Sequence, residues 1–186
     1  MYKSKVLLDD LYAQTEQFLQ KAIEKWQNMP EKAFYNKPSP TAWSAAQCLE
    51  HLNIYGRYYL PAIEKAIVKA EQKGYAATEN FKSGWLGGYF YRLMLPNTEG
   101  GLKSKMKAPA NAIPAEQPDA RAMIAEFIDQ QERMLLLIER ARKIDLASVR
   151  VPISIMKWVK LKVGDTFLFM VGHHTRHVLQ AEKTLK

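Results

Sequence analysis

Apolar residues recur at steps of three and four near the start of the chain, which is the period of a helix with one buried face. Between Lys3 and Met29 this stripe consists of Val6, Leu7, Leu11, Thr15, Phe18, Ala22 and Trp26. A first long helix is therefore predicted. Pro30 should end it, and Pro38 and Pro40 should keep the following connection extended.

A capping box marks the start of a second helix. Ser44 is followed three residues later by Gln47, so each side chain can satisfy a free backbone amide of the other residue. The helix is predicted from Ser44 to Gly74, with a kink or restart at Pro61. One of its faces is polar and aromatic, more typical of a pocket wall than of a core: Ser44, Cys48, His51, Tyr55 and Tyr58.

The middle of the chain has weaker helical signals. Residues 81–95 are rich in aromatic side chains but contain three glycines, and a short helix is predicted there. Residues 96–118 have no helical period, and they contain Gly100, Gly101, Lys103, Lys105 and Lys107. Such a stretch is too long for an ordinary connection, so it is either a covering loop or lid, or a passive surface crossover.

The last part of the chain predicts two more long helices. Asp119 can cap a helix from Ala120 to about Ile144. The β-branched run 149–163 predicts an extended segment that crosses the end of the bundle, and Asp165 can cap a final helix that ends near Lys186. The expected fold class is all-α: a four-helix bundle with a long connection between helices 2 and 3, in one domain over residues 1–186.

Composition narrows the possible functions. Lysine and arginine outnumber aspartate and glutamate by 27 to 19, and the formal net charge of +8 attracts anions. This fits nucleic acid or an acidic small molecule as partner, but it fits good solubility alone better, since no block of five like charges is present. The single cysteine, Cys48, cannot form an internal disulfide, which favours a reduced, cytoplasmic protein. No signal-peptide pattern and no apolar run long enough to cross a bilayer is visible, so we expect no membrane partner.

All four histidines fall in two segments, His51 in the second helix and His173, His174 and His177 in the last one. His173 and His177 are four residues apart and therefore share a helix face. His51 can supply a third ligand from a separate helix, which gives the arrangement of three ligands and one open position that is typical of catalytic zinc. Gln180, one turn after His177, can support that ligand with a hydrogen bond.

Two alternatives at this site stay open. The densest apolar face of the last helix is centred on His174, so the periodicity predicts that His174 is buried. A ligand pair of His174 and His177 competes with the pair of His173 and His177. Cys48 lies three residues before His51 on the same face. It is either a fourth ligand or, more commonly for such a residue, a small buried hydrophobic side chain.

The motifs Trp43-Ser44, Gln47 and Glu50-His51-Leu52, together with His173-x-x-x-His177-x-x-Gln180, resemble the two signature helices of the DinB-like (DinB/YfiT) family of metalloenzymes. Gln47 departs from the family pattern, since many relatives carry glutamate there. The resemblance implies a four-helix bundle and frequently a homodimer. It also implies a divalent metal, zinc or nickel, held by His51, His173 and His177.

In that family, the members with assigned activities include thiol-dependent transferases and isomerases that use low-molecular-weight thiols. A metal-dependent enzyme of transferase or hydrolase type, acting on a small molecule or a thiol, is therefore the first hypothesis, with Tyr55 or Tyr58 donating a hydrogen bond to the substrate. The alternative is a non-catalytic metal-containing binding or stress-response scaffold, because Glu50 lies about 100° round the helix from His51 and no clear general base is present.

Nucleic acid is a weaker candidate partner. It depends on one basic stretch that fits a solvated face better: Arg150, Lys157, Trp158, Lys160 and Lys162.

Overall fold

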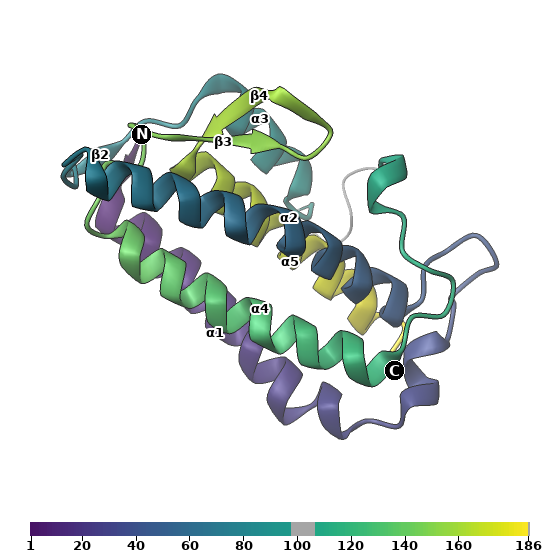
Figure 1. The fold of residues 1–186 in the computed structure, drawn as a ribbon. Helices are drawn as coiled ribbons and strands as arrows, with labels where there is room; N and C mark the ends of the chain where they lie inside the picture. Colours follow the sequence, from purple (N-terminus) through teal and green to yellow (C-terminus); the bar gives the residue numbers. More distant parts are fainter. Residues whose placement is uncertain (98–106, 186) are drawn as a thin grey trace.

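The computed structural model describes residues 1–97 and 107–185. Within these ranges the chain forms five α-helices: α1 (Ser4–Glu24), α2 (Ala45–Gln72), α3 (Trp85–Met94), α4 (Ala120–Ala141) and α5 (Val163–Glu182). The four long helices lie alongside one another, with α4 against α1 and α2, and with α5 against α2 and α1 (Figure 1). The short helix α3 packs on α5. The prediction of a mainly helical fold is therefore confirmed.

Helix α2 begins and ends as its sequence predicts. The Gln47 amide donates a hydrogen bond to Ser44 Oγ, and the Ser44 amide donates one to Gln47 Oε1, each at 3.2 Å. At the other end Gly74 has a φ of 65°, where a side chain would be strained. The Gly74 amide donates to the Glu71 carbonyl and the Tyr75 amide donates to the Ala70 carbonyl, which is the Schellman pattern of a helix end.

Pro61 does not restart the helix, so the restart that was predicted as one of two outcomes is wrong. Helix α2 runs without a break from Ala45 to Gln72 and includes Pro61. A proline inside a helix costs about 3 kcal/mol. The neighbouring Leu60 and Ile63 are almost fully buried, and the apolar surface that they remove from water favours one continuous helix.

Two small antiparallel sheets correct the all-α prediction. Strand β1 (Tyr2–Lys3) pairs with β2 (Asn80–Phe81), and β3 (Arg150–Ile153) pairs with β4 (Met156–Lys162). The predicted extended segment at 149–163 is thus a hairpin. One face of the hairpin carries the buried side chains Val151, Ile153 and Leu161, and this face packs on the helices, since β3 contacts both α2 and α5.

Asp165 does not cap its own helix, contrary to the prediction. Helix α5 already begins at Val163, and its N-cap, Lys162, makes no side-chain cap. The buried carboxylate of Asp165 instead accepts hydrogen bonds from Ser83 Oγ at 2.5 Å and from the Gly84 amide at 2.9 Å. It therefore satisfies the start of α3 and attaches α3 to α5.

The connection between α2 and α4 contains β2, α3 and a 3₁₀ turn, η3 (Ala110–Ala112). Two further 3₁₀ turns, η1 (Trp26–Asn28) and η2 (Glu31–Tyr35), follow α1. Gly100, Gly101, Lys103 and Lys105 of the lid candidate lie outside the described residues. Among the helices that are described, none is both long and apolar enough to cross a membrane.

Candidate metal centre

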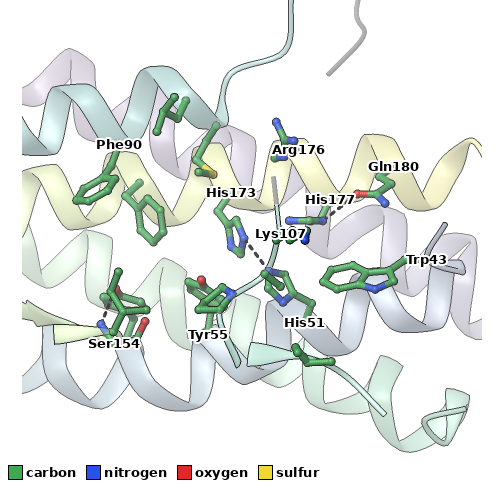
Figure 2. A pocket seen from close by; sticks show the side chains of 18 of the residues that line it. Trp43, His51, Tyr55, Phe90, Lys107, Ser154, His173, Arg176, His177 and Gln180 are labelled. Carbon is green, nitrogen blue, oxygen red and sulfur yellow. Dashed lines mark hydrogen bonds between the residues drawn. The ribbon is translucent and has the colours of Figure 1, made fainter. Parts of the chain in front are cut away.

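Three histidines from two distant parts of the sequence meet in the interior between α2 and α5 (Figure 2). The Nε2 atoms of His51 and His173 are 3.1 Å apart. The ring of His177 lies 4.7 Å from that of His51 and 4.6 Å from that of His173, centroid to centroid. All three side chains are buried, and one nitrogen of each lies within 4.8 Å of the others.

Hydrogen bonds orient two of the three rings. His51 Nδ1 lies 2.6 Å from the Ala112 carbonyl oxygen, and we assign the proton to this nitrogen because a carbonyl can only accept. His177 Nδ1 likewise donates to Gln180 Oε1 at 3.1 Å. In each ring Nε2 then keeps its lone pair, the state in which an imidazole binds a metal.

His173 is oriented by packing. Its ring stacks on Phe169 at 5.6 Å and lies 4.3 Å from the Tyr55 ring. Its Nδ1 is buried and has no hydrogen-bond partner in the part of the chain that the structure describes. Aromatic neighbours on two sides therefore fix this ring, while its Nε2 points at His51 (Figure 2).

The spacing of the three donors fits a divalent metal. Zinc–nitrogen bonds of about 2.0–2.1 Å in a tetrahedral site place the ligand nitrogens about 3.3 Å apart. The separation between His51 and His173, 3.1 Å, is close to that value, and the ligand nitrogen of His177 lies within 4.8 Å of both. Three imidazoles suit zinc, nickel, copper and iron. The cluster can therefore hold a divalent metal ion.

Burial keeps these histidines neutral. Loss of hydration lowers the pKa of His173 and of His177 well below the ordinary value. Repulsion from Arg176, and between the histidines if more than one were protonated, lowers both further. Burial also lowers the pKa of His51, against the opposing effect of the Ala112 hydrogen bond. Neutral imidazole is the form that binds a metal, so at neutral pH all three nitrogens are available.

His174 lies on the other side of α5. Its Nδ1 is 2.7 Å from the Met170 carbonyl oxygen, and its Nε2 is 3.1 Å from Gln131 Nε2. Its ring stacks on Phe18, and burial lowers its pKa to about 4. The burial predicted from periodicity is confirmed, and the structure does not bring His174 to the three-histidine cluster.

Cys48 has a free thiol and is fully buried, which is the placement expected of a small hydrophobic side chain. Burial raises the pKa of its thiol to about 12, so the thiol stays protonated at neutral pH. Its sulfur is not among the clustered ligand atoms of the described residues. The geometry thus offers three histidine ligands and gives Cys48 a packing role.

A cavity of about 860 Å³ adjoins the histidines, and all three line it together with Trp43, Gln180 and Arg176. Tyr55 lines it as predicted. Tyr58 does not: it donates a hydrogen bond to the Ile153 carbonyl at 3.3 Å and lines a smaller neighbouring cavity of about 330 Å³. The sequence reading missed Tyr59, which lines the large cavity. Tyr59 lies eight residues after His51, two steps of four, and that spacing could have identified it.

The lid candidate contributes to this cavity. Lys107, Ala108, Pro109 and Ile113 line it, so the described part of the connection forms part of the cavity wall. Its role as a lid stays a prediction.

Comparison with known proteins gives one family. The family model described as the DinB superfamily matches residues 14–181. Searches of the curated proteins and of the solved structures gave no significant match.

Proposed function

The chain belongs to the DinB superfamily, and from that premise we propose that it is a metal-dependent enzyme acting on a small molecule. His51, His173 and His177 would hold the ion, with zinc or nickel as the first choices. One observation carries the proposal: three buried, neutral imidazoles converge on one point in the wall of a cavity large enough for a substrate.

The histidines would leave the ion its full charge and a coordination position for a ligand in the cavity. When bound, the ion would supply Lewis acidity and lower the pKa of a water or thiol ligand. Tyr55 is placed to act on a substrate beside it, because its ring lies 4.3 Å from His173 and burial raises the pKa of its hydroxyl to about 12. It would stay protonated and donate a hydrogen bond. We retain Tyr58 only as a residue of the adjoining smaller cavity.

The cavity lining favours thiol transfer over hydrolysis. Among the described residues no aspartate or glutamate lines the cavity, and the nearby Glu50 is engaged by Arg57 at 2.9 Å. A metal-dependent hydrolase still has to pass the proton of the attacking water to the leaving group, and hydrolases commonly use a carboxylate for this transfer. A thiol whose pKa falls in the site is nucleophilic without such a base. We therefore propose a low-molecular-weight thiol as co-substrate.

The second candidate is a metal-containing binding or stress-response scaffold without a reaction of its own. The missing carboxylate base favours it as well. Turnover separates the two candidates: a scaffold binds metal and small molecules but converts none of them.

Metal-loaded protein mixed with a small thiol and the electrophile 1-chloro-2,4-dinitrobenzene tests the proposal. We expect conjugation above the spontaneous rate with zinc or nickel, and loss of that excess in His173→Ala. His174→Gln is the matched control, because it changes the adjacent histidine outside the cluster. If protein with bound zinc or nickel gives no turnover with any of several thiols, the scaffold is correct.

The family membership also motivates a proposal about assembly. We propose that the four long helices form a four-helix bundle in one domain and that two copies associate as a homodimer. Light scattering coupled to size-exclusion chromatography tests this, and a mass of one chain at all concentrations would contradict it.

A further inference from the structure

The large cavity has two chemically different ends. Gln180 and Trp43 lie at one end, Phe90 lies at the other, and the three histidines lie between them (Figure 2). We infer that the cavity takes a ligand with a flat aromatic body and a small metal-binding head. This inference gives the substrate class of the proposed function, and the part concerning the aromatic body holds without any metal.

Four rings form the end beyond His173, and we call them the aromatic compartment: Tyr55, Tyr59, Phe90 and Phe169. They make a continuous series of ring contacts. Tyr55 and Tyr59 are 5.9 Å apart, Tyr59 and Phe169 are 5.7 Å apart, and Phe169 and Phe90 are 6.3 Å apart, centroid to centroid. Phe169 also stacks on His173. The compartment therefore begins at the cluster itself.

The walls of the compartment come from separate elements that are fastened to one another. Tyr59 Oη accepts a hydrogen bond from the Ser154 amide at 3.1 Å, which ties α2 to the β3–β4 hairpin. The hairpin adds the apolar side chains Ile153 and Leu161 to the lining. Phe90 lies on α3, whose start Asp165 holds to α5. These contacts preorganise the compartment, which lowers the cost of binding a rigid ligand.

The shape of the compartment favours an aromatic ligand. Neighbouring rings are tilted at 59° and 65° in two of the contacts, so they present both faces and edges. Flat rings gain from such offset and edge-to-face contacts beyond the burial of their area. The Tyr59 hydroxyl is already engaged by Ser154, so the apolar part of this side chain is what a ligand meets.

The size of the cavity excludes a thiol alone as its full occupant. A volume of about 860 Å³ lies at the upper end of the 300–1,000 Å³ that is usual for whole drug-sized ligands. A thiol or hydroxyl head at the histidines would leave the aromatic compartment to a second, larger group. That group is the aromatic body of the substrate.

Binding of a neutral aromatic probe to metal-free protein tests the compartment. N-phenyl-1-naphthylamine carries no charge, so the net charge of the protein does not attract it. We expect saturable 1:1 binding by fluorescence, weakened at least tenfold in Phe90→Ala. Trp85→Ala is the matched control, because Trp85 is an aromatic residue of the same helix whose side chain is 83% exposed and does not line the cavity. Its affinity should equal that of the wild type.

Lack of saturable binding, or equal affinity in Phe90→Ala, overturns the inference whether or not the protein binds a metal. Thermal unfolding of each variant checks its fold. If Phe90→Ala does not fold, Phe169→Leu takes its place with the same expected direction.

A second titration tests the arrangement of head and body in zinc-loaded protein. 3-Phenylpropane-1-thiol should bind at least tenfold tighter than propane-1-thiol and tighter than 3-cyclohexylpropane-1-thiol, and Phe90→Ala should remove these differences. Equal affinities for the phenyl and cyclohexyl compounds would overturn the aromatic preference. If the protein binds no zinc, the proposed function fails, while the result with the neutral probe still decides the inference about the aromatic body.

Discussion

His51 Nδ1 and the Ala112 carbonyl oxygen lie 2.6 Å apart, although 61 residues separate them in the sequence. His51 belongs to α2, and Ala112 ends the 3₁₀ turn η3 in the connection that forms part of the cavity wall. The Ala112 amide in turn donates a hydrogen bond to the Pro109 carbonyl at 2.9 Å. The turn at residues 109–112 therefore orients one of the three proposed metal ligands.

Loosening this turn should weaken metal binding. Pro109→Gly removes the ring that fixes φ at the start of η3, so Ala112 should hold His51 less well. Groups that orient a ligand contribute roughly 10–100-fold to metal affinity. We expect a loss of about tenfold in zinc affinity, measured by competition with a chromogenic chelator. Ala115→Gly, in the same connection but exposed, is the control, and an equal loss there would contradict the role of Pro109.

Gln180 should act on the ion through His177. Its Oε1 accepts the hydrogen bond from His177 Nδ1 that leaves Nε2 for the metal. Gln180→Leu removes the acceptor, and zinc affinity should fall by about tenfold. Gln180→Glu keeps an acceptor and should retain the affinity of the wild type. If both variants bind zinc equally well, Gln180 has no part in the site.

Two glycines of α3 should respond differently to alanine. A Cβ at Gly87 would lie 2.3 Å from Asp165 Cγ, inside the carboxylate that joins α3 to α5. Gly87→Ala should therefore lower the free energy of unfolding by about 1–3 kcal/mol. A Cβ at Gly88 would meet only the ends of the Arg92 and Ser83 side chains, at 3.3 Å.

Gly88→Ala should leave stability unchanged or raise it by up to about 1 kcal/mol, because alanine favours a helix over glycine. Urea unfolding of both variants gives the comparison. Equal effects in the two variants would show that Asp165 does not confine Gly87.

Cys48 should be unreactive in the folded protein. Burial raises the pKa of its thiol from 9.0 to about 12, so below pH 9 almost no thiolate forms. Iodoacetamide at pH 8.5 should label unfolded protein at least tenfold faster than native protein. Fast labelling of the native protein would contradict the burial.

The sign of the pH dependence follows from the raised pKa of Cys48. Between pH 9 and about pH 12 the unfolded chain loses the thiol proton and the folded chain keeps it. The unfolded state is therefore favoured as pH rises through this range, and the contribution of Cys48 to stability is fully present only below pH 9. Cys48→Ala should have a smaller loss of stability over this range than the wild type.

The sequence predicted those features that depend on local periodicity. The capping box at Ser44 and the turn at Gly74 each depend on a few neighbouring residues, and each was found. The apolar stripe of the first helix was also found, except that Val6 is exposed and that α1 ends at Glu24. The spacing of His173 and His177 on one helix is also local. His51 was predicted to join them as the one histidine on a separate helix, and the resemblance to the family supported that choice. No local pattern joins His51 to His173, which lies 122 residues further along the chain.

The features that the sequence did not predict depend on tertiary contacts. Asp165 was predicted to cap its own helix, yet its carboxylate accepts a hydrogen bond from the Gly84 amide at the start of α3, which packs against it. Pro61 predicted a kink or a restart, yet α2 is continuous through it, and burial of the neighbouring side chains favours the continuous helix. The sequence gives no sign that the Ala112 carbonyl is special, because every residue carries the same backbone acceptor whatever its side chain.

The central claim is that His51, His173 and His177 together hold one divalent ion. The most direct test is elemental analysis of tag-free protein after equilibration with zinc and removal of the unbound ion. The wild type and His174→Gln should each retain about one zinc per chain, as expected for one site with three histidine ligands, and His173→Ala should retain almost none. Wild-type protein without zinc, or His173→Ala with a full complement, would contradict the claim.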